Sequence, residues 1–184
     1  PDHRVRLILD ACVLFPRGVR SVLLGYADAG GFAPLWSDRI AEEWARATET
    51  RLGPEEAAAA RAAEARMRAR WPEGRVAGWE ALEDPAGLPD PADAHVIAAA
   101  RAGGADGIVT ANTGDFPLRV LGAHGLARLH PDGFLTAEHA TGGALDRLLD
   151  AIEAEEGGGD RAAFRRWLKG AGLPRLAKAR ARGG

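Results

Sequence analysis

Cysteine is almost absent from the chain, because its 184 residues include only one, Cys12. A disulfide bond within the chain is therefore impossible, and a zinc site built from cysteine thiolates is excluded as well. Proteins without disulfides are typical of the reducing cytosol, so we expect a cytoplasmic location. The single thiol is expected to behave as a small buried apolar side chain.

Long apolar runs are also absent, and no segment approaches the roughly 20 apolar residues that a membrane-spanning helix needs. The polar residues 1–6 lead directly into a strand-like segment, so we expect no signal peptide and no membrane association. A hydrophobic content of 46% and a charged content of 27% are ordinary for a globular protein. The length suits one compact domain with a small appendage.

Several catalytic signatures are missing too. None of the five histidines is spaced from another as in a zinc site, and none is paired as a general base would be. We therefore expect the histidines, His95 included, to be surface or core residues. No glycine-rich phosphate-binding loop follows a predicted strand. Ser37 lacks the G-x-S-x-G context of a nucleophilic serine and is predicted to cap a helix instead.

Short β-rich runs alternate with helical segments over the first 130 residues. The predicted strands cover residues 5–9, 32–36, 76–79, 107–110 and 126–129. Helices are predicted between them, the most strongly at 54–70, where alanine, glutamate and arginine dominate. This alternation predicts an α/β fold with three layers, in which a central parallel sheet lies between helices.

The last part of the chain, from about residue 131, contains no strand signal. We therefore expect an α/β domain at 1–130 and a helical C-terminal extension at 131–184. The extension ends in a basic segment without any Asp or Glu, although the net charge of the whole chain is −2: Arg161, Arg165, Arg166, Lys169, Arg175, Lys178, Arg180 and Arg182. Such a segment is typical of contact with phosphates or an acidic partner, and equally of a solvated chain end.

Asp10 stands out, because it follows the apolar run Leu7-Ile8-Leu9 at the predicted carboxyl end of the first strand. An ionised carboxylate in such surroundings is costly unless it is paired, hydrogen-bonded or bound to a metal ion. Ligands of open α/β sheets bind at this edge of the sheet. The alternative is that Asp10 only caps the next helix or turn; we favour a functional role.

Further acids follow other predicted elements. Asp90 and Asp93 flank the start of a helix, where capping and the helix dipole alone would explain both. Asp115 comes just after the strand at 107–110, within a stretch of ordinary turn residues. Glu43 lies on the apolar side of the helix that begins after Ser37, so we expect Glu43 to point inward and Glu42 to face solvent.

Together, the segments that carry Asp10, Glu43, Asp93 and Asp115 each place an acid near one edge of the sheet. Carboxylates this close repel one another and raise each other's pKa, and a divalent cation relieves the repulsion. Oxygen ligands without cysteine or paired histidine suit Mg²⁺ or Mn²⁺ rather than zinc. Such ions activate a water and stabilise an in-line phosphoryl displacement, which is the chemistry of nucleases.

The ordered set of motifs resembles the PIN domain, of the kind found in VapC-type toxins of bacterial toxin–antitoxin systems. The resemblance covers residues 5–131 and rests on LDACVL at 9–14, Glu43 in the helix that starts at Ser37, LPDPADAHV at 88–96 and IVTANTGDFP at 108–117. Looser similarity to a longer subgroup of the family extends to HPDGFL at 130–135 and GLPR at 172–175.

This resemblance implies the roles of individual residues. Asp10, Glu43, Asp93 and Asp115 would form the acidic quartet that holds Mg²⁺ or Mn²⁺. Thr110 and Asn112 match polar positions near the fourth acid, and Asp90 matches an additional acid that supports the site or caps the helix.

The resemblance also implies an activity and its partners. The implied activity is endonucleolytic hydrolysis of RNA by a metal-activated water. The implied partners are an antitoxin protein that blocks the acidic pocket and a second copy of the chain in a homodimer. Typical small toxins of the family end near the last strand, so the roughly fifty additional residues could bind antitoxin, bind RNA or complete the core.

Three alternatives keep the fold class but change the function. A receiver-type signalling domain phosphorylated on aspartate would need a lysine after a late strand, whereas the only lysines are Lys169 and Lys178. A phosphatase that uses Asp10 as its nucleophile would commonly have a second aspartate two residues later, where Cys12 stands instead. A catalytically inactive PIN-like binding module is the third alternative, and the intact set of acids argues against it.

Overall fold

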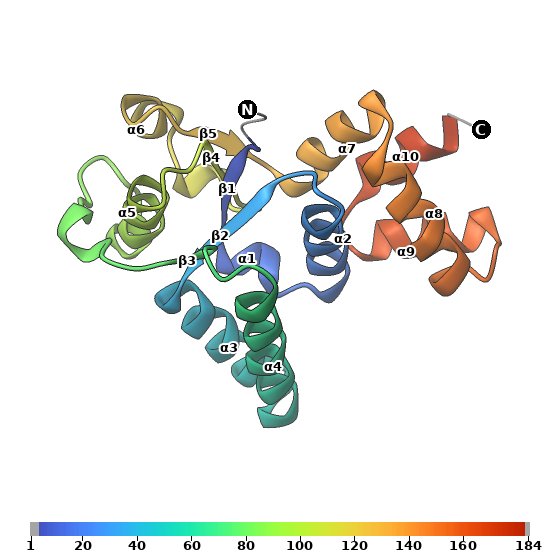
Figure 1. Cartoon of the computed structure of the whole chain (residues 1–184), viewed down its shortest axis with the longest axis horizontal. Helices are drawn as coiled ribbons and strands as arrows, with labels where there is room; N and C mark the ends of the chain where they lie inside the picture. Colours follow the sequence, from blue (N-terminus) through green and yellow to red (C-terminus); the bar gives the residue numbers. More distant parts are fainter. Residues whose placement is uncertain (1–3, 183–184) are drawn as a thin grey trace. The chain divides into compact units, whose positions relative to one another are not determined.

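The computed structural model describes residues 4–182, and its centre is a five-stranded sheet in which all pairings are parallel (Figure 1). The strand order is β3-β2-β1-β4-β5. The strands are β1 (Arg6–Leu9), β2 (Ala33–Ser37), β3 (Arg75–Val76), β4 (Gly107–Val109) and β5 (Ala127–Leu129). The predicted α/β class, with a central parallel sheet and a helical C-terminal part, is confirmed.

The chain forms two compact units, of which the first contains the sheet and comprises the residues up to Phe15 together with Ala33–Leu129. Its helices are α1 (Ala11–Leu14), α3 (Asp38–Leu52), α4 (Pro54–Arg70), α5 (Ala94–Ala102) and α6 (Leu118–Ala123), with short 3₁₀ helices at Glu80–Leu82, Pro91–Asp93 and Thr113–Asp115. Residues Leu7, Ile8 and Leu9 of β1 are fully buried, as expected for the central strand of a covered parallel sheet.

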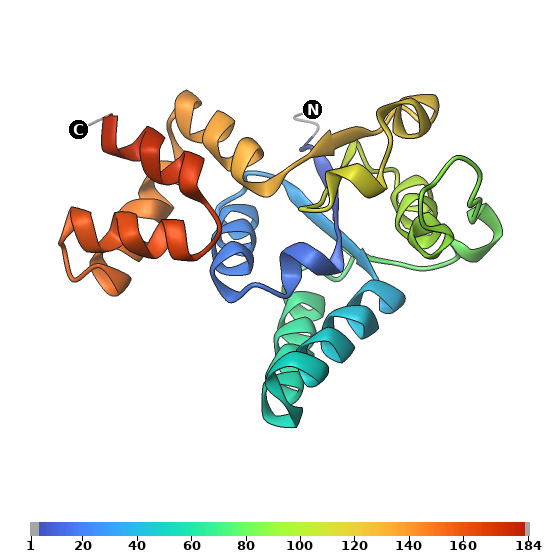
Figure 2. The ribbon, with the colours of Figure 1, turned by 180° about the vertical axis from the view of Figure 1, so that it is seen from behind.

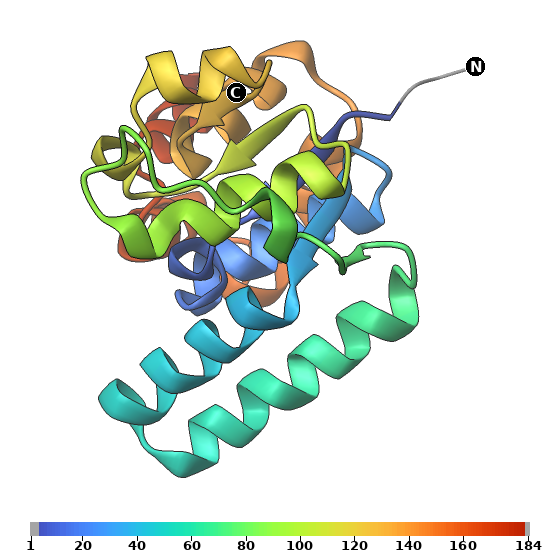
Figure 3. The same ribbon diagram turned by 90° about the vertical axis from the view of Figure 1, so that its left-hand side faces the viewer.

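Helices α3 and α4 form an antiparallel hairpin, which Figure 3 shows as two long helices side by side. Gly53 joins them with a φ of 97°, a conformation that favours glycine, and Pro54 occupies the first position of α4. Ser37 caps α3 as predicted, since its hydroxyl oxygen accepts a hydrogen bond from the Ile40 amide at 3.2 Å. This cap fixes the start of the helix that carries Glu43.

The second unit is helical and comprises Pro16–Phe32 together with the chain from His130 onward. Its helices are α2 (Arg17–Asp28), α7 (Pro131–Thr141), α8 (Ala144–Glu156), α9 (Arg161–Gly170) and α10 (Pro174–Arg182) (Figure 2). Tyr26, Phe32 and Phe134 form an aromatic cluster with ring centroids 5.7 to 6.2 Å apart. The structure therefore groups residues 16–32 with the helices of the C-terminal part of the chain.

Asp132 ties the beginning of this C-terminal region to its end. Its buried carboxylate accepts hydrogen bonds from the backbone amides of Arg175 at 2.9 Å and Leu176 at 3.0 Å, at the first turn of α10. A carboxylate at this position satisfies amides that have no partner within the helix and complements the helix dipole. The segments 130–135 and 172–175, which are far apart in the sequence, therefore meet through one side chain.

No helix within residues 4–182 is long and apolar enough to cross a membrane.

Candidate metal-dependent nuclease site

The candidate site lies at the carboxyl edge of the sheet, where β1 and β4 end side by side. The chain runs from β1 to β2 on one side of β1, whereas β4 pairs with its other side. Open α/β sheets bind ligands at such a reversal of strand order, outside the carboxyl ends of the strands. Asp10 directly follows β1 and Thr110 directly follows β4, so both stand at this point.

Asp10 is 8% exposed and is held by three donors. One carboxylate oxygen accepts a hydrogen bond from the Ala11 amide at 2.8 Å, which makes Asp10 the N-cap of α1. The other oxygen accepts hydrogen bonds from the Thr110 hydroxyl at 2.8 Å and from the Cys12 thiol at 3.2 Å. Burial raises the pKa of Asp10, the three hydrogen bonds oppose this effect, and the charge of Glu43 raises the pKa further. Capping and the functional role are therefore compatible in one side chain.

Thr110 and Cys12 belong to a small network behind Asp10. The buried Thr110 hydroxyl, which donates to Asp10, accepts a hydrogen bond from the Asn112 amide at 3.1 Å. The Cys12 sulfur accepts a hydrogen bond from the Ala111 amide at 3.3 Å, and burial raises the pKa of the thiol to about 11. Cys12 therefore stays protonated near neutral pH and acts as a donor to Asp10. Asn112 contributes through its backbone, and its side chain is exposed.

Asp93 lies directly before the first residue of α5, and other acidic side chains act on it. Its pKa is raised to about 6, first by partial burial and then by the charges of Asp10, Asp115 and Asp90, while His95 has the opposite effect. Asp90 is exposed and caps the 3₁₀ helix Pro91–Asp93, because its carboxylate accepts a hydrogen bond from the Ala92 amide at 2.9 Å. The structure thus brings Asp10, Asp93 and Asp115 into electrostatic contact and gives Asp90 the capping position.

Glu42 and Glu43 are neighbours on α3, yet they make different contacts. Glu43 lies 2.8 Å from Nε2 of His95, and its charge reaches Asp10. Glu42 instead pairs with the exposed side chains of Arg46 at 3.2 Å and Arg61 at 3.0 Å. The two side chains are similarly exposed, at 38% for Glu43 and 41% for Glu42, so they differ in their partners rather than in their burial.

His95 is the residue of this site that the sequence did not reveal. It was expected to be an ordinary surface or core histidine, and it is only 1% exposed, with its ring 5.9 Å from that of Trp79. Its Nε2 contacts Glu43, while its Nδ1 is buried without a hydrogen-bond partner among residues 4–182. The only sequence signal is its place two residues after Asp93 in a helix that is otherwise almost entirely alanine and aliphatic. A polar residue among seven consecutive buried positions needs a partner, and Glu43 is that partner.

Comparison with known families decides the identity of the domain. A family model described as the PIN domain matches residues 6–114, which is more than half of the chain. The chain belongs to the PIN-domain family. No curated protein and no solved structure matches it at a significant level. The PIN match contains Asp10, Glu43, Asp93 and Thr110, and it ends directly before Asp115.

PIN domains are in general metal-dependent nucleases, so the donor set must suit a divalent cation. The carboxylates of Asp10, Asp93, Asp115 and Glu43 are hard oxygen donors, and burial together with the charges of Asp10 and Asp115 raises the pKa of Asp93. No three His, Cys, Asp or Glu side chains among residues 4–182 are grouped closely enough to surround an ion by themselves. Mg²⁺ usually keeps several waters and takes only one or two protein carboxylates, so this looser set fits the ion.

Proposed function

We propose that this PIN domain is a Mg²⁺- or Mn²⁺-dependent endoribonuclease and the toxin of a toxin–antitoxin pair. The observation that carries the nuclease proposal is that Asp10, buried at the carboxyl edge of the sheet, accepts a hydrogen bond from the Thr110 hydroxyl at 2.8 Å. The negative charges of Glu43 and Asp93 act on this carboxylate, and a cation that binds there would relieve their repulsion. The proposed ligands are Asp10, Asp93, Asp115 and Glu43, with Thr110, Asn112 and Asp90 in support.

When bound, Mg²⁺ or Mn²⁺ lowers the pKa of a coordinated water and neutralises phosphate oxygens. The side chains around it would orient the ligands. Thr110, Cys12 and the Ala11 amide fix both oxygens of Asp10, which is thereby preorganised. His95 would hold Glu43 on the side of α3, and Asp93 would be ionised above about pH 6.

The nuclease proposal is tested with purified protein, Mg²⁺ or Mn²⁺, and a pool of RNA, with single-stranded and double-stranded DNA in parallel reactions. Asp10→Asn is expected to lower RNA cleavage at least about 100-fold, because it removes a charged ligand. Asparagine is as good an N-cap as aspartate, so α1 should survive the change. Asp160→Asn, the same change at the exposed N-cap of α9, serves as the matched control and should leave cleavage unchanged.

Equal cleavage by wild type and Asp10→Asn would overturn the proposed site. Cleavage of DNA but not RNA would keep the metal-dependent nuclease and refute the ribonuclease. Loss of activity with EDTA and its return with Mn²⁺ would identify the cofactor class directly.

The toxin role, the antitoxin and a homodimer are supported by the resemblance of segments 9–14, 88–96 and 108–117 to VapC-type toxins. A neighbouring reading frame that encodes a small DNA-binding protein is expected. Expression of the chain alone should arrest growth, and co-expression of that neighbour should relieve the arrest. The expected complex would elute together in size-exclusion chromatography and would be inactive on RNA. Growth that continues while active nuclease accumulates would refute the toxin role.

The inactive PIN-like binding module remains the second candidate, because no compact triad of metal-binding side chains is found within residues 4–182. Calorimetric titration with Mn²⁺ separates the two. A nuclease should bind Mn²⁺, and the Asp10→Asn variant should bind it with lower affinity. A module that has lost its activity should not bind Mn²⁺ at this site.

A further inference from the structure

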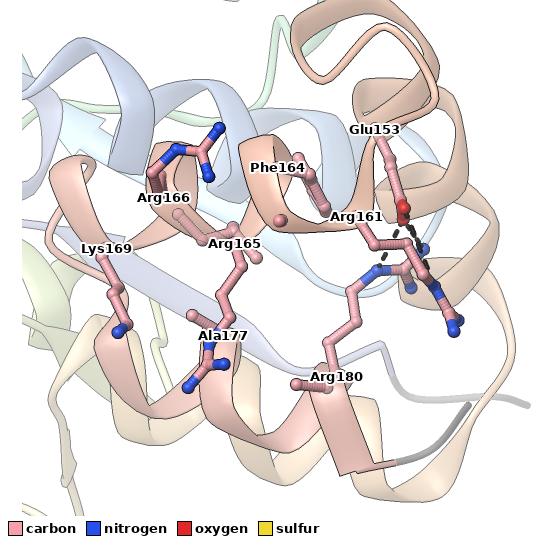
Figure 4. Close-up of a pocket in the computed structure, with 11 residues that line it drawn as sticks. Glu153, Arg161, Phe164, Arg165, Arg166, Lys169, Ala177 and Arg180 are labelled. Atoms are coloured by element: carbon pink, nitrogen blue, oxygen red, sulfur yellow. Dashed lines mark hydrogen bonds and ion pairs between the residues drawn. The ribbon is translucent and has the colours of Figure 1, made fainter.

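The second unit contains a cleft between α9 and α10 that plays no part in the site described above (Figure 4). It encloses about 400 Å³, and its wall on α9 carries Arg161, Arg165 and Lys169. These three residues follow one another at intervals of four, so they share one face of the helix, and successive side chains are separated by about 6 Å along its axis. In Figure 4, the side chains of Arg165 and Lys169 point toward α10, whereas that of Arg166, which also lines the cleft and lies 4.0 Å from Asp160, points the opposite way.

Acidic side chains compensate the positive charges of Arg161, Arg165 and Lys169 only weakly. Arg165 and Lys169 have no ion-pair partner among residues 4–182, and Arg161, whose side chain is 71% exposed, reaches Glu153 only at 4.0 Å. Arg180, at the end of the cleft, differs from them, because Asp150 at 2.5 Å and Glu153 at 2.8 Å neutralise it. Three neighbouring cations on a chain with a net charge of −2 repel one another unless an anion binds.

We propose that this face of α9, defined by Arg161, Arg165 and Lys169, binds consecutive phosphates of single-stranded RNA. The inference deepens the proposed function, because it rests on RNA as the substrate of the PIN domain. The regular spacing of the cations along the helix suits a ligand whose charges also repeat at regular intervals. Guanidinium groups pair with phosphate oxygens in a two-point geometry, and each neutralised phosphate releases counterions.

The floor of the cleft argues for a polyanion rather than a protein partner. Phe164, Leu168 and Ala177 line it, yet each is at most 2% exposed, and the Arg180 guanidinium lies 5.6 Å from the centre of the Phe164 ring. Protein interfaces generally gain their affinity from apolar and aromatic anchors that enter accessible pockets. What this cleft offers a ligand is therefore largely the stems and charged ends of long side chains such as Arg161, Arg165 and Lys169, which suit phosphate binding and provide no aromatic anchor point.

The test measures binding of a fluorescently labelled single-stranded oligoribonucleotide to the full chain by anisotropy, with EDTA present so that no cleavage occurs. The variant Arg161→Gln/Arg165→Gln/Lys169→Gln is compared with Arg147→Gln/Lys178→Gln/Arg182→Gln, which removes the same charge from exposed positions of the same unit outside the cleft. Circular dichroism and thermal midpoints establish that both variants are folded.

The cleft variant is expected to bind roughly tenfold more weakly near physiological salt, and its slope of log affinity against log salt should fall by about 2, since each contact to a single strand contributes about 0.7. The control variant should retain most of the affinity for RNA and most of its dependence on salt. Equal losses in the two variants would reduce the effect to net charge and overturn the proposal, as would no loss in either.

Two further arms identify the ligand and separate this inference from the nuclease proposal. A poly-glutamate peptide, or inorganic phosphate at matched ionic strength, should compete poorly; effective competition by either would refute the backbone site. RNA cleavage by the wild type is measured separately, with Mg²⁺ or Mn²⁺ in place of EDTA. If the wild type binds through the cleft but never cleaves RNA, the nuclease proposal fails and the cleft stands. If the wild type cleaves RNA while the cleft variant binds RNA normally, the cleft proposal fails and the nuclease proposal stands.

Discussion

Asp10 shows how a single carboxylate is kept in an apolar environment and remains available for a ligand. Burial raises its pKa, and the donors Ala11, Thr110 and Cys12 each favour the ionised form. Each carboxylate oxygen has two lone-pair sites, so these bonds leave capacity for a cation. The cap and the network thus fix the orientation of Asp10 and leave its charge to be compensated from outside the sheet.

Asp93 gives the site a defined pH dependence. Its pKa is raised from 3.8 to about 6, so the folded protein binds more protons than the unfolded chain between these values. The contribution of Asp93 to the free energy of unfolding of the metal-free protein should therefore fall as the pH rises from about 4 to about 6. Mn²⁺ needs the ionised carboxylate, so its affinity should rise over the same interval, by roughly tenfold for each pH unit below the pKa.

Urea unfolding with EDTA and calorimetry with Mn²⁺, each across this pH range, measure the two effects. Asp93→Asn is the control, because it cannot ionise. The free energy of unfolding of the wild type, taken relative to that of Asp93→Asn, should fall across this range. A difference between the two proteins that stays constant from pH 4 to 6 would contradict the assignment.

His95 is expected to act as a positioning residue for Glu43. His95→Leu fills a similar volume, removes the 2.8 Å contact to Glu43 and also removes the unpartnered Nδ1, so the fold should be retained or slightly stabilised. Mn²⁺ affinity and RNA cleavage should fall 10- to 100-fold, as is typical when a partner of a metal ligand is lost. His95→Gln, which keeps a donor, should recover part of both. Unchanged Mn²⁺ affinity in the leucine variant would show that His95 is purely structural.

Asp10, His95 and Asp93 also show how far the sequence predicts the site. Asp10 could be found because an acid directly after an apolar strand is locally anomalous. The role of His95 could not, because its partner Glu43 belongs to a different helix and the contact arises only when α3 and α5 are placed around the sheet. Asp93 was ambiguous for the same reason: a helix start explains an acid there, and only the neighbouring charges raise its pKa.

At the scale of elements, the boundaries set by local chemistry were predictable. Helix α4 spans Pro54–Arg70 as expected, because Gly53 and Pro54 define its start within the sequence itself. A strand was expected at 76–79, but β3 comprises Arg75–Val76, so only Val76 is common to both. β3 is a short edge strand that pairs with β2 alone. Helix α1 was not predicted, because four residues carry no helical periodicity and depend on the cap that Asp10 provides.

Asp132 should contribute more to stability than an ordinary helix cap. Asp132→Ala removes two buried, charge-assisted hydrogen bonds to α10 and is expected to lower the free energy of unfolding by about 2–4 kcal/mol. The matched variant Asp160→Ala removes one exposed cap from α9 and should cost only about 1 kcal/mol. Urea denaturation monitored by circular dichroism gives both values. Equal costs for the two substitutions would mean that α7 and α10 are not coupled through Asp132.

At the scale of the whole molecule, the chain enters the helical unit twice. Helix α2 belongs to it by its contacts with α7 and α8, although the segment Ala33–Leu129 of the sheet-containing unit separates α2 from α7 in the sequence. One face of α2 is apolar and buried, but amphipathicity alone does not identify what covers such a face. The C-terminal helices are therefore more than an addition to a complete domain.

This connectivity makes a prediction about truncation. A chain that ends at Leu129 resembles a short PIN domain in sequence, but it would leave the apolar side chains of α2, among them Val22, Leu23 and Tyr26, without α7 and α8. Exposed apolar patches of this kind favour association, so the truncated protein should aggregate or lose cooperative unfolding. Co-expression of residues 130–184 as a separate chain should restore solubility, because it supplies the missing partners of α2. Size-exclusion chromatography and thermal denaturation measure both effects. A soluble, monomeric and cooperatively unfolding truncated protein would show instead that α2 needs no cover from the C-terminal helices.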